Sequence, residues 1–144
     1  MKMLIPVLLS LLLLISCSPT PQPIDFGTDM CAHCKMTIVE KPFSAELVSV
    51  KGKVFKFDAI ECMVHYLEQN SENEYALFLV RDYSAPDDWQ DARQCAYLIS
   101  ENLPSPMGAF LSAYRSPDAA GKMQEERGGE VFGWNELKQR ISRH

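Results

Sequence analysis

Two pairs of potential metal ligands have the spacing of a treble-clef fold. Cys31 and Cys34 form the first pair, and Cys62 and His65 follow after 27 further residues. This spacing is typical of a tetrahedral zinc site, in which a short knuckle and the first turns of a helix each supply two ligands. The pattern therefore predicts a small domain built around one metal ion.

Two further side chains favour copper over zinc. Met36 lies two residues after Cys34, and His33 lies between the two cysteines of the first pair. Thiolates and thioethers are soft donors, and soft donors select Cu(I) among the common biological metals. A thioether is a poor ligand for zinc, so Met36 favours a Cu(I) site.

The amino terminus has the features of a bacterial lipoprotein signal. A positive start is followed by an apolar run of about 12 residues, which is too short to span about 30 Å of hydrocarbon. The run ends in Leu14-Ile15-Ser16-Cys17, which resembles a lipobox. We therefore expect a signal peptide at 1–16, lipid on Cys17 and an extracytoplasmic location on a bacterial membrane. An ordinary signal peptide or an uncleaved anchor is the alternative.

Residues 17–28 are expected to be the lipid anchor and a proline-rich tether, followed by a metal-binding domain at 29–144. Prolines alternate in the tether at Pro19, Pro21 and Pro23, which favours an extended chain. Removing residues 1–16 takes away Lys2 and changes the formal charge from −5 to −6. Such an acidic protein is a poor candidate for binding nucleic acid.

The pattern of apolar residues predicts a mixed fold. In the first half, strands are expected at 37–39, 43–50, 54–57 and 75–80. Asp58 is the expected N-cap of a helix that runs to about Asn70, with Glu61 completing a capping box. In the second half, strands are expected at 94–100, 109–114 and 130–132, a rigid loop at 104–108, and helices at 117–127 and 134–141. The acidic cluster of Asp87, Asp88 and Asp91 is interpreted as a solvated loop.

The predicted fold class is therefore α+β. We expect two small ββα-type, treble-clef-like halves, at about 29–82 and 83–144, that share one compact domain. The second half reads as a looser copy of the first.

Three ordered motifs resemble the NosL family of accessory lipoproteins of nitrous oxide reductase. They are Cys31-x-x-Cys34-x-Met36, Phe57-Asp58-x-x-x-Cys62-x-x-x-Tyr66, and Pro106-Met107-Gly108 followed by Phe110. The resemblance covers about residues 29 to 135. The family commonly has glycine where this chain has Lys35, and a glycine-rich approach where this chain has Ser105.

The resemblance implies a two-part ββα-type protein that binds one Cu(I). It also implies delivery of copper for the copper–sulfide centre of nitrous oxide reductase, with that enzyme and its copper and sulfur maturation transporter as partners. The candidate Cu(I) ligands are Cys34, Met36, Met107, Cys62, Cys31 and His33. Cys95 borders an apolar strand and is interpreted as a small buried residue.

Other interpretations remain open from the sequence. A structural zinc site formed by Cys31, Cys34, Cys62 and His65 would make the domain an interaction module. The Cys-x-x-Cys pair is also compatible with a thiol–disulfide oxidoreductase, although loop precedes it and β-branched residues follow it. We expect no enzyme, because the chain has no Ser/His/Asp order and no phosphate-binding glycine loop.

Overall fold

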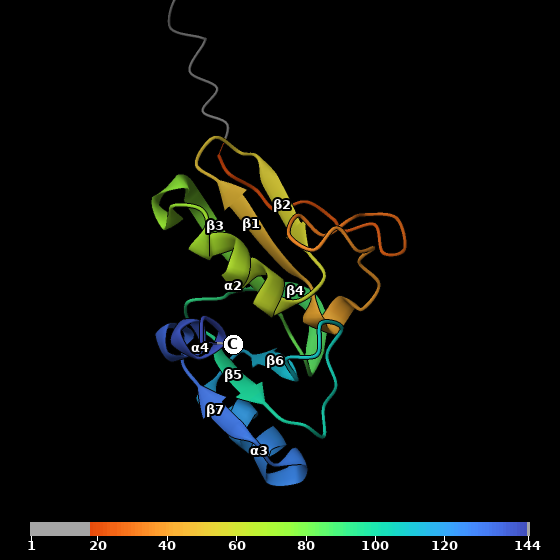
Figure 1. The fold of residues 1–144 in the computed structure, drawn as a ribbon, viewed down its shortest axis with the longest axis vertical. Helices are drawn as coiled ribbons and strands as arrows, with labels where there is room; N and C mark the ends of the chain where they lie inside the picture. Colours follow the sequence, from red (N-terminus) through yellow and green to blue (C-terminus); the bar gives the residue numbers. More distant parts are fainter. Residues whose placement is uncertain (1–17, 144) are drawn as a thin grey trace, which may run out of the picture.

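The computed structural model describes residues 18–143. Two antiparallel sheets form two lobes that share one core (Figure 1). The expected signal peptide and Cys17 lie outside the described residues. Among the described helices, none has the length and hydrophobicity needed to span a bilayer.

The first sheet has the strand order β2-β1-β3-β4. Its strands are β1 (Ala45–Ser49), β2 (Val54–Phe57), β3 (Tyr75–Asp82) and β4 (Ala85–Asp91). A turn at Gly52, which has a φ of +82°, joins β1 to β2. Helix α2 (Ile60–Glu68) follows β2 and packs on this sheet, and the short 3-10 helices η2 (Lys41–Phe43) and η3 (Glu72–Glu74) precede β1 and β3.

The second sheet has the order β6-β5-β7 and is covered on both faces. It consists of β5 (Ala96–Ile99), β6 (Leu111–Tyr114) and β7 (Glu130–Phe132), with α3 (Pro117–Arg127) and α4 (Trp134–Ile141). Successive side chains of a strand point to opposite faces. Leu98 accordingly joins a small cluster with Ala120 of α3, whereas Tyr97 joins the main core with Trp134 of α4.

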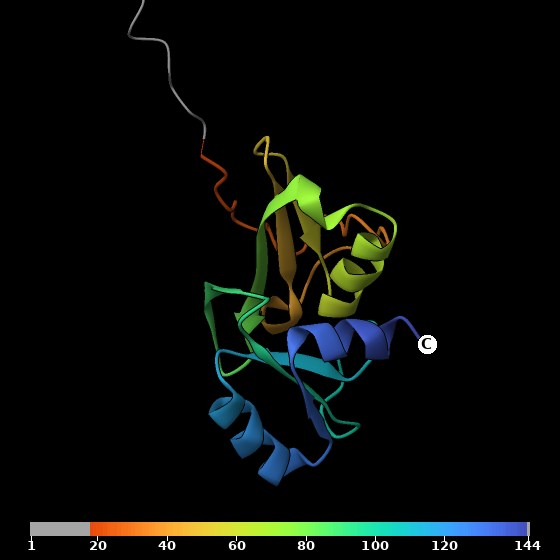
Figure 2. The same cartoon turned by 90° about the vertical axis from the view of Figure 1, so that its left-hand side faces the viewer.

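Helix α4 contacts both α2 and β5, and β6 contacts β3 directly, so the two lobes pack against each other (Figures 1 and 2). Buried residues from both lobes, including Leu47, Ile60, Leu111 and Leu137, belong to one continuous core. The expected α+β class and the shared core are therefore confirmed.

The second part of the expected tether is attached to the first sheet. The Gln22 backbone N–H donates to Glu46 Oε1 at 2.9 Å, and the Lys56 ammonium donates to the Pro23 carbonyl at 2.7 Å. Ile24 is buried in the main core. The chain therefore leaves the folded body near Gln22, and both faces of β1 are covered. Glu46 is fully buried for this reason, although it stands between apolar residues in the pattern of a strand with one face in solvent.

Glu46 is expected to make folding stability depend on pH. Burial raises its pKa to about 7 and leaves Oε2 without a hydrogen-bond partner. The pKa of an exposed glutamate in the unfolded chain is about 4.3. Between these values the folded protein keeps a proton that the unfolded chain has lost, so the free energy of unfolding should fall as pH rises from 5 to above 7.

Glu46→Gln removes this titration. Compared with the parent, its loss of stability between about pH 5 and 7.5 should be smaller by on the order of 2 kcal/mol. Denaturant unfolding of both proteins at the two pH values measures the difference. An identical loss in both proteins would contradict the assignment.

Two local expectations in the first half are wrong. Residues 37–39 form only an isolated bridge between Thr37 and Met30, because this segment pairs with loop rather than with a neighbouring strand. Ala59, not Asp58, is the N-cap of α2, and it makes no side-chain capping bond. The Asp58 carboxylate is buried and accepts a hydrogen bond from the Val39 backbone N–H instead.

The acidic cluster expected to be loop belongs to β4, which pairs with β3, so the first sheet extends to Asp91. The pairing is stabilised by side chains of both strands. The Arg81 guanidinium lies 3.5 Å from the centroid of the Trp89 ring and donates to the Asp87 carbonyl at 2.6 Å. The side chains of this outer strand are exposed or half-buried and mostly polar, which hid the strand from the hydrophobic pattern.

Candidate metal centre

Three cysteine side chains meet in the first lobe, two from the loop that precedes β1 and one from the start of α2. The sulfur atoms of Cys31, Cys34 and Cys62 all lie within 4.8 Å of one another. Cys31 and Cys62 are buried, whereas Cys34 is half-buried. Within residues 18–143, this is the one group of three or more potential His, Cys, Asp or Glu ligands close enough to share an ion. None of the four cysteines in that part of the chain forms a disulfide.

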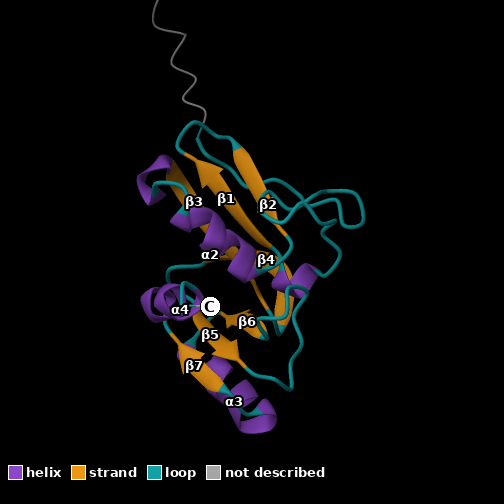
Figure 3. Cartoon of the chain, viewed as in Figure 1, coloured by secondary structure: helices purple, strands orange, loops and turns teal. Residues whose placement is uncertain are grey.

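The loop at 31–36 holds the first two cysteines in a tight turn. The Lys35 N–H donates to the Cys31 carbonyl at 3.1 Å, and the Cys31 N–H donates to the Met36 carbonyl at 2.8 Å. A third bond, from the Ala32 N–H to the Lys56 carbonyl at 2.8 Å, fixes the turn to β2. Much of the segment before β1 is loop, as Figure 3 shows, and such bonds order it.

Lys35 has a φ of +65°, in the left-handed region. This conformation costs a residue with a Cβ atom roughly 1–2 kcal/mol, whereas glycine adopts it freely. The turn is therefore strained in this chain.

We expect Lys35→Gly to raise the free energy of unfolding by about 0.5–1 kcal/mol, because relief of strain exceeds the added chain entropy. Denaturant unfolding of the metal-free protein measures this. Lys122→Gly, at an exposed position within α3, is the matched control and should lower stability by about 1 kcal/mol. Equal destabilisation by both substitutions would contradict the strain.

The three thiols are not equivalent. The Cys62 thiol donates a hydrogen bond to the Cys31 sulfur, and the backbone N–H groups of Asp58, Cys34 and His33 also point to it, which lowers the pKa of Cys31 to about 4. The anionic Cys31 sulfur in turn holds the proton on Cys62 and raises the pKa of that thiol. Burial raises the pKa of Cys34. These shifts favour the thiolate at Cys31 and the thiol at Cys34 and Cys62, so a metal that binds all three sulfurs must displace protons.

The two histidines lie beside one another. The rings of His33 and His65 stack with their centroids 5.7 Å apart. The Nδ1 atom of His65 lies 3.0 Å from Glu68 Oε2, one turn further along α2. Neither histidine is part of the group of three sulfurs. The structure thus brings three of the four expected treble-clef ligands together.

The two candidate thioether ligands are exposed. The exposed fraction is 55% for Met36 and 38% for Met107. The Met36 backbone N–H donates to the Cys34 sulfur, which places its main chain at the site. Met107 belongs to the loop between β5 and β6. That loop is bonded to Glu61, the residue before Cys62.

Sequence reasoning missed the part that Asp58 and Glu61 play around the cysteines. Both carboxylates are buried, and burial raises the pKa of each. The Asp58 N–H supports the Cys31 thiolate, while Glu61 accepts hydrogen bonds from the loop of Met107. The available signal was the spacing of Glu61, three residues before Val64 on the apolar face of the helix.

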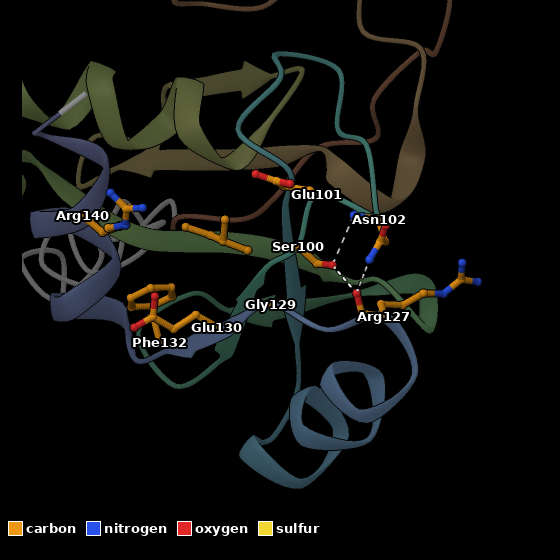
Figure 4. Close-up of a pocket in the computed structure, with 9 residues that line it drawn as sticks. Ser100, Glu101, Asn102, Arg127, Gly129, Glu130, Phe132 and Arg140 are labelled. Carbon is orange, nitrogen blue, oxygen red and sulfur yellow. Dashed lines mark hydrogen bonds between the residues drawn. The ribbon is translucent and has the colours of Figure 1, made fainter.

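A cavity of about 580 Å³ lies in the second lobe (Figure 4). Its lining includes Ser100, Asn102, Arg127 and Arg140. The Ser100 hydroxyl and the Asn102 amide both donate to the Arg127 carbonyl, at 2.8 and 2.9 Å, and so satisfy the carboxyl end of α3. These polar groups stabilise a helix end, so their arrangement does not require a bound ligand.

The arrangement fits a soft metal ion. Three sulfur atoms lie close together, and two of them belong to the buried residues Cys31 and Cys62. Cys34 and the exposed methionines lie toward solvent, so a metal bound here is accessible to another donor. Soft ligands of this kind suit Cu(I) and zinc better than Mg²⁺ or Ca²⁺.

Comparisons with known proteins agree with this fold. The model of the NosL family matches residues 23–142. The crystal structure of the copper chaperone NosL from Shewanella denitrificans superposes with a TM-score of 0.72 at 23% sequence identity. The match covers 82% of this chain and 95% of that one. No curated protein sequence matches the chain significantly.

Proposed function

The chain belongs to the NosL family, and from this premise we propose that it is a metallochaperone that binds Cu(I) and passes it to an acceptor protein. The observation that carries the proposal is the group of three cysteine sulfurs, which lie within 4.8 Å of one another, with Cys34 half-buried. The relative of similar fold is described as a copper chaperone. In this reading copper is the cargo, and the protein is a carrier rather than a catalyst.

The donor set supports Cu(I) as that cargo. Cu(I) has a filled d shell, and soft sulfur donors bind it well. The Cys31 thiolate is already anionic, so one strong donor is present before the metal arrives. A carrier must also release its metal, and the half-buried Cys34 leaves a side open to a competing thiol or thioether. Met36 and Met107, on exposed loops, are the proposed thioether ligands.

A structural zinc site is the second candidate, because three cysteines within 4.8 Å also suit Zn²⁺. Its expected fourth ligand, His65, instead stacks on His33 and contacts Glu68. A closed tetrahedral zinc site needs that ligand, whereas an open Cu(I) site does not. This difference favours copper.

The two candidates differ in their need for methionine. Met36→Leu and Met107→Leu conserve volume and hydrophobicity, so each should change the free energy of unfolding by less than about 1.5 kcal/mol. Each should nevertheless weaken Cu(I) binding, while Zn(II) binding stays unchanged. Anaerobic titrations with Cu(I) and Zn(II) in competition, paired with thermal unfolding, measure both effects.

Met30→Leu is the matched control, since Met30 is exposed in the same loop and is not a proposed ligand. The parent should bind about one Cu(I) and prefer it to Zn(II). If both Met→Leu variants bind Cu(I) as the parent does, the thioether argument fails. Tight stoichiometric zinc that Cu(I) does not displace would favour the structural site.

We further propose where the copper goes. The motif resemblance favours delivery for the copper–sulfide centre of nitrous oxide reductase, together with that enzyme's maturation transporter. The lipobox at Leu14–Cys17 favours an extracytoplasmic carrier attached to a bacterial membrane. Loss of nitrous oxide reductase activity on deletion of the gene, restored by the parent chain, is the test in cells.

A further inference from the structure

Glu61 is a buried carboxylate next to a proposed metal ligand. It lies in the first turn of α2, directly before Cys62, and only 4% of it is exposed. Its Oε1 atom accepts two hydrogen bonds, from the Ser105 hydroxyl and from the Ala109 backbone N–H, both at 3.3 Å. Both donors belong to the loop at 105–111, which comprises the end of the β5–β6 connection and the first residue of β6 and carries Met107. Glu61 therefore joins the helix of one proposed ligand to the loop of another.

The bonds to Glu61 also order the loop internally. The Ser105 hydroxyl accepts a hydrogen bond from the Leu111 N–H at 3.3 Å while it donates to Glu61. The Ser105 carbonyl accepts from the Gly108 N–H at 3.0 Å. Gly108 and Phe110 have φ values of +78° and +56°, so the backbone turns sharply around Met107. A residue with a Cβ atom at a positive φ needs surrounding contacts to hold it.

A buried carboxyl group at position 61 lowers stability, so it is a poor choice if the residue only fills space in the core. Its Oε2 atom is buried without a hydrogen-bond partner. Burial of a carboxyl group that is incompletely hydrogen-bonded lowers stability, and an apolar residue of similar volume would pack in the same place at lower cost. What an apolar residue would not do is bond the loop at 105–111.

We propose that Glu61 is a positioning residue, which holds the loop at 105–111 so that the Met107 thioether stays in place relative to Cys62. The inference rests on the proposed function, in which Met107 and Cys62 both bind Cu(I). A loop that is ordered on folding does not have to be ordered when the metal binds, so less binding free energy is lost. Glu61 would thus preorganise the site without touching the metal.

Two variants separate positioning from charge. Glu61→Gln keeps an oxygen acceptor but removes the charge, whereas Glu61→Leu keeps the approximate volume and removes the acceptor. In the metal-free full-length protein, amide hydrogen exchange across 105–111 should be like the parent in Glu61→Gln and faster in Glu61→Leu. Ser105→Ala, which removes one donor from a half-buried position, gives the same test if Glu61→Leu does not fold.

The effect on Cu(I) affinity is measured in a double-mutant cycle. Glu61→Leu should weaken Cu(I) affinity by roughly 10–100-fold, as is usual for groups that position a ligand. Combined with Met107→Leu it should cause little further loss, because both changes remove the same thioether. Combined with Met36→Leu, the losses should add. Glu61→Gln should bind Cu(I) as the parent does.

Three results would overturn the inference. They are unchanged exchange at 105–111 in Glu61→Leu, equal loss of Cu(I) affinity in Glu61→Gln and Glu61→Leu, and full additivity with Met107→Leu. A parent protein that does not bind Cu(I) would instead overturn the proposed function. In that event the exchange measurement still decides whether Glu61 holds the loop.

Discussion

Cys31→Ser is expected to weaken Cu(I) binding by more than the roughly 10–100-fold that loss of an outer group costs. Cys31 is the thiolate of the group, stabilised by the Cys62 thiol and by backbone N–H donors. A serine hydroxyl is a hard donor and does not ionise at neutral pH, so the substitution removes both the charge and the soft atom. An anaerobic competition titration against a Cu(I) chelator measures the loss.

Serine substitutions of the other three cysteines provide two comparisons and a control. Cys34→Ser and Cys62→Ser should also weaken binding, since the three sulfurs lie within 4.8 Å of one another. Cys95→Ser is the matched control, because Cys95 is buried outside this group. A buried hydroxyl there should lower the free energy of unfolding by about 1–3 kcal/mol and leave Cu(I) affinity unchanged. Cu(I) affinity that falls in Cys95→Ser but not in Cys31→Ser would refute the assigned centre.

Local signals predicted the helices and the strand that close the domain with the correct bounds. Helix α3 begins at Pro117, β7 covers Glu130–Phe132 and α4 covers Trp134–Ile141, as expected. Ser116 caps α3 by accepting from the Ala119 N–H, and Gly128 ends that helix. Proline at a first helical position and glycine after a last one act through neighbouring atoms, so the sequence alone reveals them.

Features that depend on distant contacts could not be predicted in this way. The capping residues expected for α2 have other partners, because Asp58 contacts Val39 and Glu61 contacts a loop 48 residues further along the chain. Glu46 alternates with apolar residues along β1, as a solvent-facing residue does, but the segment around Gln22 covers it. In each case a polar side chain contacts a partner that is distant in the sequence, and not the local partner or the solvent that its position suggested.

The candidate centre was predictable in part. The spacing of Cys31, Cys34 and Cys62 was enough to bring these residues to one site, because a knuckle and a helix start are local structures. The position of the His65 side chain was not predictable, because its ring also contacts His33 and Glu68. A ligand pattern fixes which residues can meet, and packing decides which of them do.

Cys17→Ala is expected to release the protein from membranes or to block its processing. Each buried CH₂ group of a lipid chain contributes about 0.8 kcal/mol, so two or three chains on Cys17 would give nearly permanent attachment. Removing the thiol removes the acceptor for all of the thioether-linked lipid. Membrane fractionation and the mass of the mature amino-terminal peptide measure the change, with Ser18→Ala as the control that should keep the lipid.

The same substitution should leave metal binding intact. Because Gln22 is bonded to Glu46 and Ile24 lies in the core, the described residues 18–21 would reach only about 12 Å in extended form. Cys17→Ala protein should therefore bind Cu(I) as tightly as the parent, yet mature nitrous oxide reductase poorly in cells, because it no longer stays at the membrane. Unchanged fractionation together with an unchanged peptide mass would show that Cys17 carries no lipid. Weaker Cu(I) binding would show instead that residue 17 takes part in the site.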